Sequence, residues 1–292
     1  MLTLPYDDLT DPVRLADWLE LCALVSPDHN SSRGDLGGAL RTASLSELGD
    51  DYAVERKELE VFAELEDRTK ACERAYPFGT DCPGLLQVKP GGWQAFPVYV
   101  FCLCLSYYPL TESKVAPKLF ERISCLAASS YLHGQAVGFG SPRSELPASF
   151  ADAVARVCQL MGEGGGYRTQ PSLSCKDDTL DLVAWRDFAD LKTSKILMFG
   201  QCGAGKDWSG KLGELDPNAF WRQWMRDGAV SPEPLKSFFT PYRIRQCQWD
   251  HCARKAGVLF DRCRIAYWAH QELADHARLM EWTGKFLQGL CQ

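Results

Sequence analysis

Hydrophobic residues in the first third of the chain recur at the spacing of amphipathic helices. Asp11 and Pro12 form a typical helix start, because an aspartate side chain can cap the first turn and proline is tolerated there. Ser31 and Ser32 provide a second possible cap. The pattern predicts three helices, over residues 12–25, 34–43 and 54–76.

The third predicted helix is the longest and carries many charges. Leu59, Phe62 and Leu65 remain as an apolar stripe, which predicts that this face packs on a partner helix. Two short helices before a long one also occur in helix-turn-helix proteins, so docking on DNA is an alternative. A small helical bundle is the preferred interpretation, because residues 26–35 contain few base-reading side chains and several acids.

The middle of the chain predicts a domain boundary. Prolines and glycines in residues 81–97 indicate a loop or a short hairpin. The apolar run over residues 96–110 is shorter than the roughly 20 residues that span a bilayer, so it predicts a buried helix or strand and no membrane contact. We therefore expect a mainly helical domain over residues 1–110, which binds a partner or DNA, and a second domain over residues 111–292.

The hydrophobic period changes from helical to extended in the second half. Residues 179–188 alternate between apolar and polar positions, and residues 195–202 are a continuous apolar run typical of a central strand. The short polar link between them suits a hairpin. The remaining pattern predicts helices over 118–134, 150–167, 217–228 and 268–290 and strands over 235–244 and 256–268. The expected fold class is α/β, with a mixed sheet flanked by helices.

Composition and charge narrow the classes of function. Of the 292 residues, 46% are hydrophobic and 24% charged, as in an ordinary globular protein. The net charge of −6 gives no overall attraction to nucleic acid, so DNA contacts must come from local basic clusters. The 13 cysteines are scattered, and the N-terminus lacks the pattern of a secretion signal, which predicts reduced thiols in the cytoplasm.

A glycine-rich stretch follows the second predicted strand. Gly200, Gly205 and Lys206 satisfy the pattern G-x-x-x-x-G-K, in which backbone amides cradle phosphates. Asp207 then occupies the position where the pattern needs a serine or threonine for magnesium. A nucleotide-binding P-loop protein, with its loop over residues 200–206, is therefore the lesser alternative.

Two oxygen-bearing side chains predict a metal site instead. Asp181 lies in the first predicted strand and Gln201 at the end of the second, and a hairpin could bring these ends together. A carboxylate and an amide oxygen suit Mg²⁺ or Mn²⁺, which can activate a water and neutralise charge on a phosphate. Lys206 could orient that water or hold the phosphate. Strand capping by Asp181 and hydrogen bonding by Gln201 are the structural alternatives.

These segments resemble a known family. The sequences LFERI, DDTLDLVAW and ILMFGQC, in this order, resemble the core of the PD-(D/E)XK superfamily of restriction-endonuclease-like nucleases. The branch related to Mrr restriction enzymes, where glutamine commonly replaces the second acid, is the most similar. The resemblance covers roughly residues 118–267. It implies a core of helix, three strands, helix and strand, and magnesium-dependent hydrolysis of DNA phosphodiesters.

The resemblance also assigns roles to residues. It implies Asp181 as the main metal ligand, Gln201 as a second ligand and Glu121, on the first helix, as a third. The family's lysine stands two residues beyond the glutamine, where this chain has Gly203, so Lys206 is the first lysine that could serve.

The resemblance implies a metal-dependent DNA endonuclease. By analogy with the family, the setting is a recruited or triggered effector of prokaryotic anti-phage defence, with protein partners; the oligomeric state is open. Because the lysine is displaced, an inactive restriction-like subunit that binds DNA or has a structural role is the alternative. A zinc site through Cys247 and His251, spaced i and i+4, is a weaker possibility, since a second ligand pair is absent.

Overall fold

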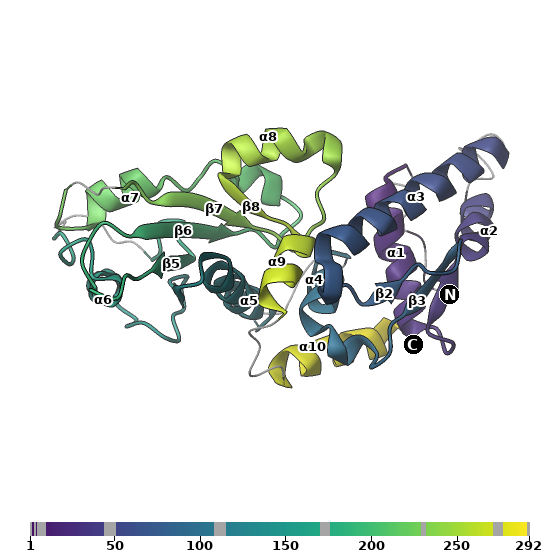
Figure 1. Cartoon of the computed structure of the whole chain (residues 1–292), viewed down its shortest axis with the longest axis horizontal. Coiled ribbons are helices and arrows are strands. Elements are labelled where there is room, and N and C mark those ends of the chain that lie inside the picture. Colours follow the sequence, from purple (N-terminus) through teal and green to yellow (C-terminus); the bar gives the residue numbers. More distant parts are fainter. Residues whose placement is uncertain are drawn as a thin grey trace.

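A computed structural model describes residues 2, 4, 10–43, 51–107, 115–169, 176–228, 232–270 and 277–290. Figure 1 shows two halves side by side, one mainly helical and containing the N-terminal segment, the other built around a larger sheet. The fold is mixed α/β, as the hydrophobic pattern predicts.

The N-terminal half consists mostly of helices. Its elements are α1 (Pro12–Val25), β1 (Asn30–Ser32), α2 (Arg33–Ala43), α3 (Asp51–Cys72), β2 (Phe78–Gly79), β3 (Leu85–Val88) and α4 (Pro97–Tyr107). The three strands form an antiparallel sheet in the order β1-β3-β2. Residues 81–97, where the sequence predicts a loop or a short hairpin, contain β3, which forms a hairpin with β2 just before this range. Asp11 caps α1, because its Oδ1 accepts a hydrogen bond from the backbone N–H of Val13 at 3.0 Å. Helix α4 is buried along its whole length, which confirms a buried segment there.

Helix α3 buries only part of the predicted stripe. Leu65 is fully buried and Phe62 packs against the core, as predicted, whereas Leu59 is 58% exposed and Val61 is buried instead. The buried face also carries Glu58 and Arg68, which form ion pairs inside the protein. The prediction missed these positions because a search for apolar residues treats every charged position as exposed.

The second half is organised by a five-stranded sheet. Its strands are β4 (Gln135–Gly138), β5 (Leu182–Arg186), β6 (Ile196–Cys202), β7 (Leu235–Phe239) and β8 (Val258–Phe260), in that spatial order. β4, β5 and β6 pair antiparallel, and β6, β7 and β8 pair parallel. The predicted hairpin is confirmed, with Leu182 opposite Gly200. The carboxyl ends of the three parallel strands therefore lie at one edge of the sheet.

Helices cover both faces of this sheet (Figure 1). They are α5 (Val115–Leu132), α6 (Phe150–Met161), α7 (Pro217–Trp224), α8 (Gln246–Ala256) and α9 (Arg262–Ala269). Successive strand residues face opposite layers. Met198 packs in the same core as α5 and α9, whereas Leu197 and Phe199 pack with α6 and α7. Phe238 packs with α8.

The hydrophobic pattern does not predict β4 or α8. β4 is a short edge strand, and α8 buries only Cys252 and Ala256, so neither segment has a strong periodic signal. The strand predicted over residues 256–268 is also shorter than expected. It ends at Phe260, because Asp261 caps α9 by accepting a hydrogen bond from the backbone N–H of Arg264 at 3.1 Å.

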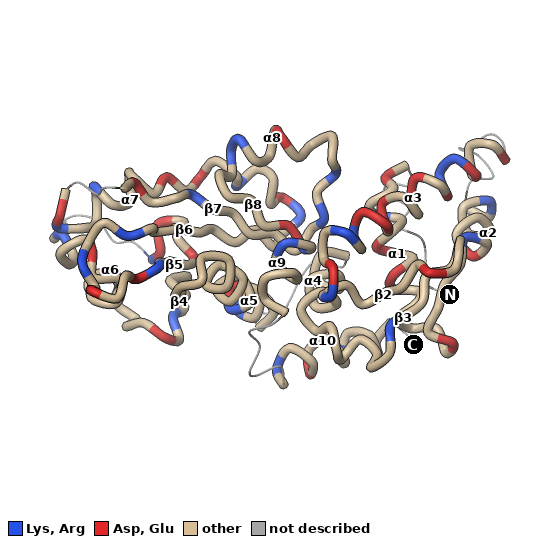
Figure 2. The backbone as a smooth tube through the Cα atoms, in the orientation of Figure 1, with Lys and Arg blue, Asp and Glu red and all other residues tan. Residues whose placement is uncertain are grey.

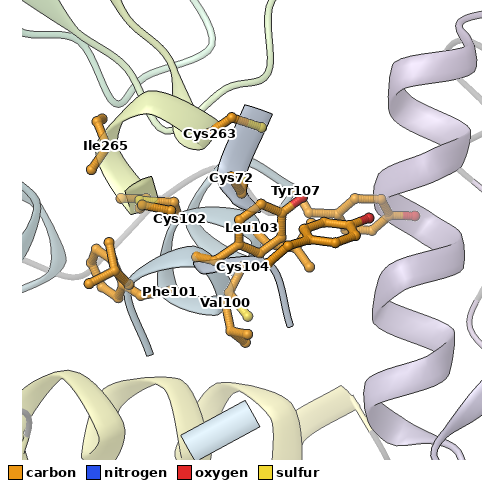
Figure 3. Close-up of a cluster of buried hydrophobic side chains, with 14 of the residues drawn as sticks. Cys72, Val100, Phe101, Cys102, Leu103, Cys104, Tyr107, Cys263 and Ile265 are labelled. Atoms are coloured by element: carbon orange, nitrogen blue, oxygen red, sulfur yellow. The ribbon is translucent and has the colours of Figure 1, made fainter. Parts of the chain in front are cut away.

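The two halves share one apolar core. In Figure 2, Lys and Arg segments are interleaved with Asp and Glu segments, including where the halves meet. Between the halves, Cys72 of α3, residues of α4 and Cys263 of α9 lie in one buried cluster (Figure 3). The last helix, α10 (Ala277–Leu290), packs against α4 rather than against the large sheet. The predicted boundary at residues 110/111 lies outside the described residues, but packing crosses it extensively.

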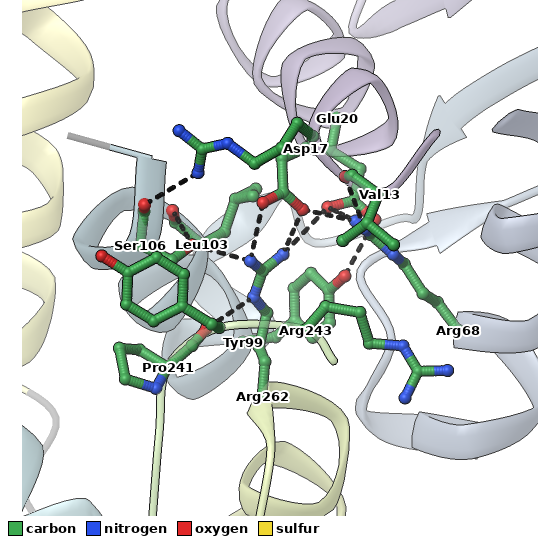
Figure 4. Close-up of polar contacts among 12 residues, drawn as sticks. Val13, Asp17, Glu20, Arg68, Tyr99, Leu103, Ser106, Pro241, Arg243 and Arg262 are labelled. Carbon is green, nitrogen blue, oxygen red and sulfur yellow. Dashed lines mark hydrogen bonds and ion pairs between the residues drawn. The ribbon is translucent and has the colours of Figure 1, made fainter. Parts of the chain in front are cut away.

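A buried ionic cluster also joins the halves (Figure 4). We call Asp17, Glu20, Arg68 and Arg262 the junction cluster. Arg262 donates to both carboxylate oxygens of Asp17, at 2.7 and 3.0 Å, and Arg68 donates to Oδ1 of Asp17 at 2.7 Å. All four side chains are at most 2% exposed. Burial raises the pKa of Asp17, but the guanidiniums of Arg262 and Arg68 outweigh it and lower the pKa to about 2.

Candidate active site

Asp181 is fixed by backbone hydrogen bonds on both sides. Its N–H donates to the carbonyl of Gly200 at 2.9 Å, and its carbonyl accepts from the N–H of Phe139 at 2.7 Å. These bonds extend the β4-β5-β6 ladder by one residue. The carboxylate Oδ2 accepts a hydrogen bond from the backbone N–H of Cys202 at 2.7 Å. One carboxylate oxygen is therefore held at the end of β6, which leaves Oδ1 for other partners.

Glu121 and Lys118 come to the same place from α5. They lie on consecutive turns of the helix, and Lys118 Nζ donates to Glu121 Oε2 at 2.6 Å. Lys118 Nζ also donates to the carbonyl of Gly140 at 3.0 Å. The Glu121 side chain is 18% exposed and that of Lys118 is 32% exposed. The group is thus partly open to solvent.

Gly140 shows that the two carboxylates face a common point. A Cβ built on Gly140 would lie 2.8 Å from Asp181 Oδ1 and 2.9 Å from Glu121 Oε2. No side chain could occupy that position without displacing an oxygen. The glycine therefore leaves a small space between two convergent carboxylate oxygens, at the end of β4. We call Glu121, Asp181 and Lys118, together with this space, the acid-pair site.

Both carboxylates of the acid-pair site keep their protons to higher pH than free carboxylates do. Burial is the main cause that raises the pKa of Asp181 to about 7; the negative charges of Glu121 and Asp177 contribute to this rise, whereas the N–H of Cys202 and the charge of Lys118 oppose it. Burial likewise raises the pKa of Glu121, against the effect of Lys118. Two close, partly desolvated carboxylates of this kind accept a proton or a cation readily.

Gln201 does not join the acid pair. Its side chain lies on the same face of β6 as Leu197 and Phe199, as strand alternation requires, and its Nε2 donates to Glu214 at 2.7 Å. Its Oε1 is buried without a hydrogen-bond partner in the described parts of the chain. The β6 residue on the acid-pair face is Cys202, whose thiol pKa is raised by burial and by the charges of Asp181 and Glu121.

Lys206 is exposed in the turn after β6 and forms no hydrogen bond or ion pair within the described ranges. The cation that does contact the acid pair is Lys118.

The structure around Lys206 differs from that of a phosphate-binding loop, in which a helix should begin at the lysine. A short 3₁₀ turn follows instead, and α7 begins only at Pro217. Gly200 lies inside β6.

Asp177 lies close enough to the acid pair for its charge to raise the pKa of Asp181, but its neighbour has another partner. Asp178, next to Asp177, accepts a hydrogen bond from the indole N–H of Trp224 at 2.6 Å. Cys247 and His251 are both exposed on α8. Among the residues that the structure describes, no group of three or more histidine, cysteine, aspartate or glutamate side chains could hold a metal ion. The described cysteines are all free thiols.

Sequence reasoning missed two parts of the acid-pair site. Lys118 had a detectable signal, because a lysine three residues before a helical glutamate places the two side chains on one face. Gly140 had no such signal, since only the fold shows what its missing Cβ would meet.

No protein-family model matches the chain, and neither curated proteins nor solved structures give a significant match. Within the described residues, every helix is too short or too polar to cross a bilayer.

Proposed function

We propose that the protein is a divalent-metal-dependent nuclease that hydrolyses DNA phosphodiester bonds at the acid-pair site. The observation that carries the proposal is the convergence of Asp181 Oδ1 and Glu121 Oε2 on the space beside Gly140. Mg²⁺ typically uses one or two protein carboxylates and completes its shell with water and substrate phosphate oxygens. A pair of carboxylates is therefore sufficient for this class of site.

The order of elements supports a restriction-like core. Helix α5, strands β4, β5 and β6, helix α7 and strand β7 follow one another as helix, three strands, helix and strand, with α6 inserted after β4. This is the order that the resemblance implies. Asp181 and Glu121 also occupy the strand start and the first helix of that core.

The residues of the chain would divide the work as follows. Asp181 and Glu121 would hold Mg²⁺ or Mn²⁺, which supplies an activated water and charge neutralisation when bound. The N–H of Cys202 orients the Asp181 carboxylate through Oδ2. Lys118 carries a positive charge at Glu121, where it can contact a phosphate oxygen and assume the role that Gly203 leaves vacant.

Cleavage of supercoiled plasmid and linear DNA with Mg²⁺ or Mn²⁺ tests the proposal. We expect activity in the wild type, and a loss of about a hundredfold or more in Asp181→Asn and Glu121→Gln, because either change removes a ligand charge. Glu66→Gln, at an exposed position of α3, is the matched control and should leave cleavage unchanged. Full activity in both site variants would refute the assignment.

The positions of Gln201 and Lys206 favour a second candidate, an inactive restriction-like subunit that binds DNA. In this case neither metal supports cleavage in the wild type, while DNA binding persists and falls with rising salt. A cleavage assay and a binding assay with the same DNA therefore distinguish the two candidate functions.

A further inference from the structure

A second cavity lies at the junction of the two halves, away from the acid pair. Its volume is about 600 Å³, which is within the usual range for small-molecule sites. The first turn of α1, the 3₁₀ turn after β6, the segment after β7 and helix α8 form its walls. None of Asp181, Glu121, Lys118 and Lys206 lines it. We call it the junction cavity.

The junction cavity lies beyond the carboxyl ends of parallel strands. Trp208 and Leu212 come from the connection that leaves β6, and Tyr242 comes shortly after the end of β7. β6 and β7 are adjacent and parallel. In open α/β sheets, ligands characteristically bind outside this edge, because the loops that leave the strands diverge there.

The lining carries an excess of positive charge. Arg14, Arg243, Arg245 and Lys255 contribute cations, against the carboxylates of Asp11 and Asp17. Both carboxylates are already committed, since Asp11 caps α1 and Asp17 is bound by the junction cluster.

Two of the four cations are available to a ligand. Arg243 is held by Glu64 and Asp261, and is therefore structural. Arg14 donates to the carbonyl of Ser106 at 3.1 Å. Lys255 is exposed and forms no ion pair within the described ranges, and Arg245 forms only a long ion pair with Asp11, at 3.8 Å. These two positive groups lie at opposite ends of α8, next to one wall of the cavity.

The backbone of α8 adds to this field. Arg245 stands at its N-cap position and makes no side-chain capping hydrogen bond, and the N–H of Gln248 donates to the carbonyl of Arg245 at 2.9 Å. Arg245, Cys247 and Gln248 from this turn line the cavity. Uncapped N–H groups at a helix start carry partial positive charge and suit phosphate oxygens.

Aromatic rings complete the lining. The rings of Trp208 and Tyr242 are nearly parallel, with centroids 6.1 Å apart and planes at 22°. The hydroxyl of Tyr242 is buried and has no hydrogen-bond partner in the described parts of the chain.

We propose that the junction cavity binds a nucleoside phosphate, with its phosphate at Arg245 and the start of α8 and its base beside Trp208. A cation and N–H groups meet the requirements of the phosphate, and the aromatic wall meets those of the base. This site is independent of the acid pair, and binding to it does not require nuclease activity. The loop from Gly203 to Leu212 connects the two sites, because it begins directly after Cys202.

Isothermal titration calorimetry with AMP, GMP, CMP and UMP tests the proposal, with adenosine and pyrophosphate as partial ligands. At least one nucleotide should bind saturably, and adenosine and pyrophosphate should each bind about tenfold more weakly or worse, since each lacks one half of the contacts. Pyrophosphate binding as tight as nucleotide binding would overturn the nucleoside part. Absence of saturable binding by all six compounds would overturn the site.

Variants locate the binding. Arg245→Glu should weaken nucleotide binding by about tenfold or more, because a charge-assisted hydrogen bond is lost, and Lys255→Glu, at the other end of α8, should weaken it less. Arg254→Glu is the matched control, since Arg254 is exposed on the same helix but outside the cavity lining. Trp208→Leu should weaken nucleotide binding and leave pyrophosphate binding unchanged. Equal weakening by Arg254→Glu would show general electrostatics and overturn the location.

Discussion

The junction cluster and the acid-pair site both bury carboxylates, but they shift the pKa values of Asp17 and Asp181 in opposite directions. Asp17 is surrounded by guanidiniums, and its pKa falls to about 2. Asp181 has another carboxylate as its close neighbour, and burial raises its pKa to about 7. The first arrangement is internally neutralised and therefore serves cohesion. The second sets two carboxylates against one lysine, Lys118, so a net negative charge remains, which costs stability and creates affinity for a cation.

The largest effect is expected from breaking the junction cluster. Arg262→Met should lower the free energy of unfolding by about 3–5 kcal/mol, because it leaves the Asp17 carboxylate buried with fewer partners. Urea denaturation followed by circular dichroism measures this. Arg254→Met, at an exposed position, is the control and should change stability by less than about 0.5 kcal/mol. A loss below about 1 kcal/mol in Arg262→Met would mean that the cluster contributes little.

The converse is expected at the acid-pair site, where Asp181→Asn should stabilise the protein. The pKa of Asp181 is raised from 3.8 to about 7 on folding, so its contribution to stability is complete below pH 3.8 and is lost as the pH rises to 7. Asparagine mimics the protonated acid and keeps an acceptor for the Cys202 N–H. We expect a gain of about 1–4 kcal/mol at pH 8 and almost none near pH 4, measured by urea denaturation at both. A loss at pH 8 would contradict the charge repulsion.

Metal binding should relieve the same repulsion. Millimolar Mg²⁺ or Mn²⁺ should raise the stability of the wild type by about 1–3 kcal/mol at pH 8 and less at pH 6, where protons compete for Asp181. Thermal unfolding with and without the ion measures this gain. Gly140→Ala should abolish it, because the new Cβ would lie less than 3 Å from both carboxylate oxygens. An equal gain in Gly140→Ala would place the ion elsewhere.

The smallest effect is expected at Lys206. Comparing it with Lys118 tests whether the lysine chosen from the sequence or the lysine that contacts Glu121 in the structure serves the site. Lys206→Ala should change cleavage by less than about twofold and stability by less than about 0.5 kcal/mol, since its side chain is exposed. Lys118→Ala should reduce cleavage by about tenfold or more, through the lost contact at Glu121. The opposite ranking of these two variants would restore Lys206 to the site.

Periodicity in the sequence predicted the secondary structure well where one face of an element is apolar. The hairpin of β5 and β6 and the buried α4 are clear cases. It failed where buried faces are polar, as on α3, whose inner face includes Arg68. The partners that neutralise such residues lie far away in sequence, so no local pattern reveals them.

The candidate site, like the secondary structure, was predicted only in part. Asp181 and Glu121 were selected from the sequence, and the structure brings them together. Gln201 was selected for its position near a strand end, but strand parity directs its side chain to the other layer. A shift of one residue along β6 would place the Gln201 side chain on the other face of the sheet. Pairing with β5 and β7 sets this register, and the sequence of β6 alone does not reveal it.

The contact between Asp17 and Arg262 has a consequence for the order of folding. These partners are separated by 245 positions along the chain. During synthesis, the N-terminal helices therefore emerge with Asp17 and Glu20 still lacking one of their two arginines. The ionic core can close only after α9 has left the ribosome, because a domain cannot make contacts to residues not yet synthesised. Late closure of this kind makes the final stability of the N-terminal half depend on the synthesis of α9, more than 200 residues after Asp17.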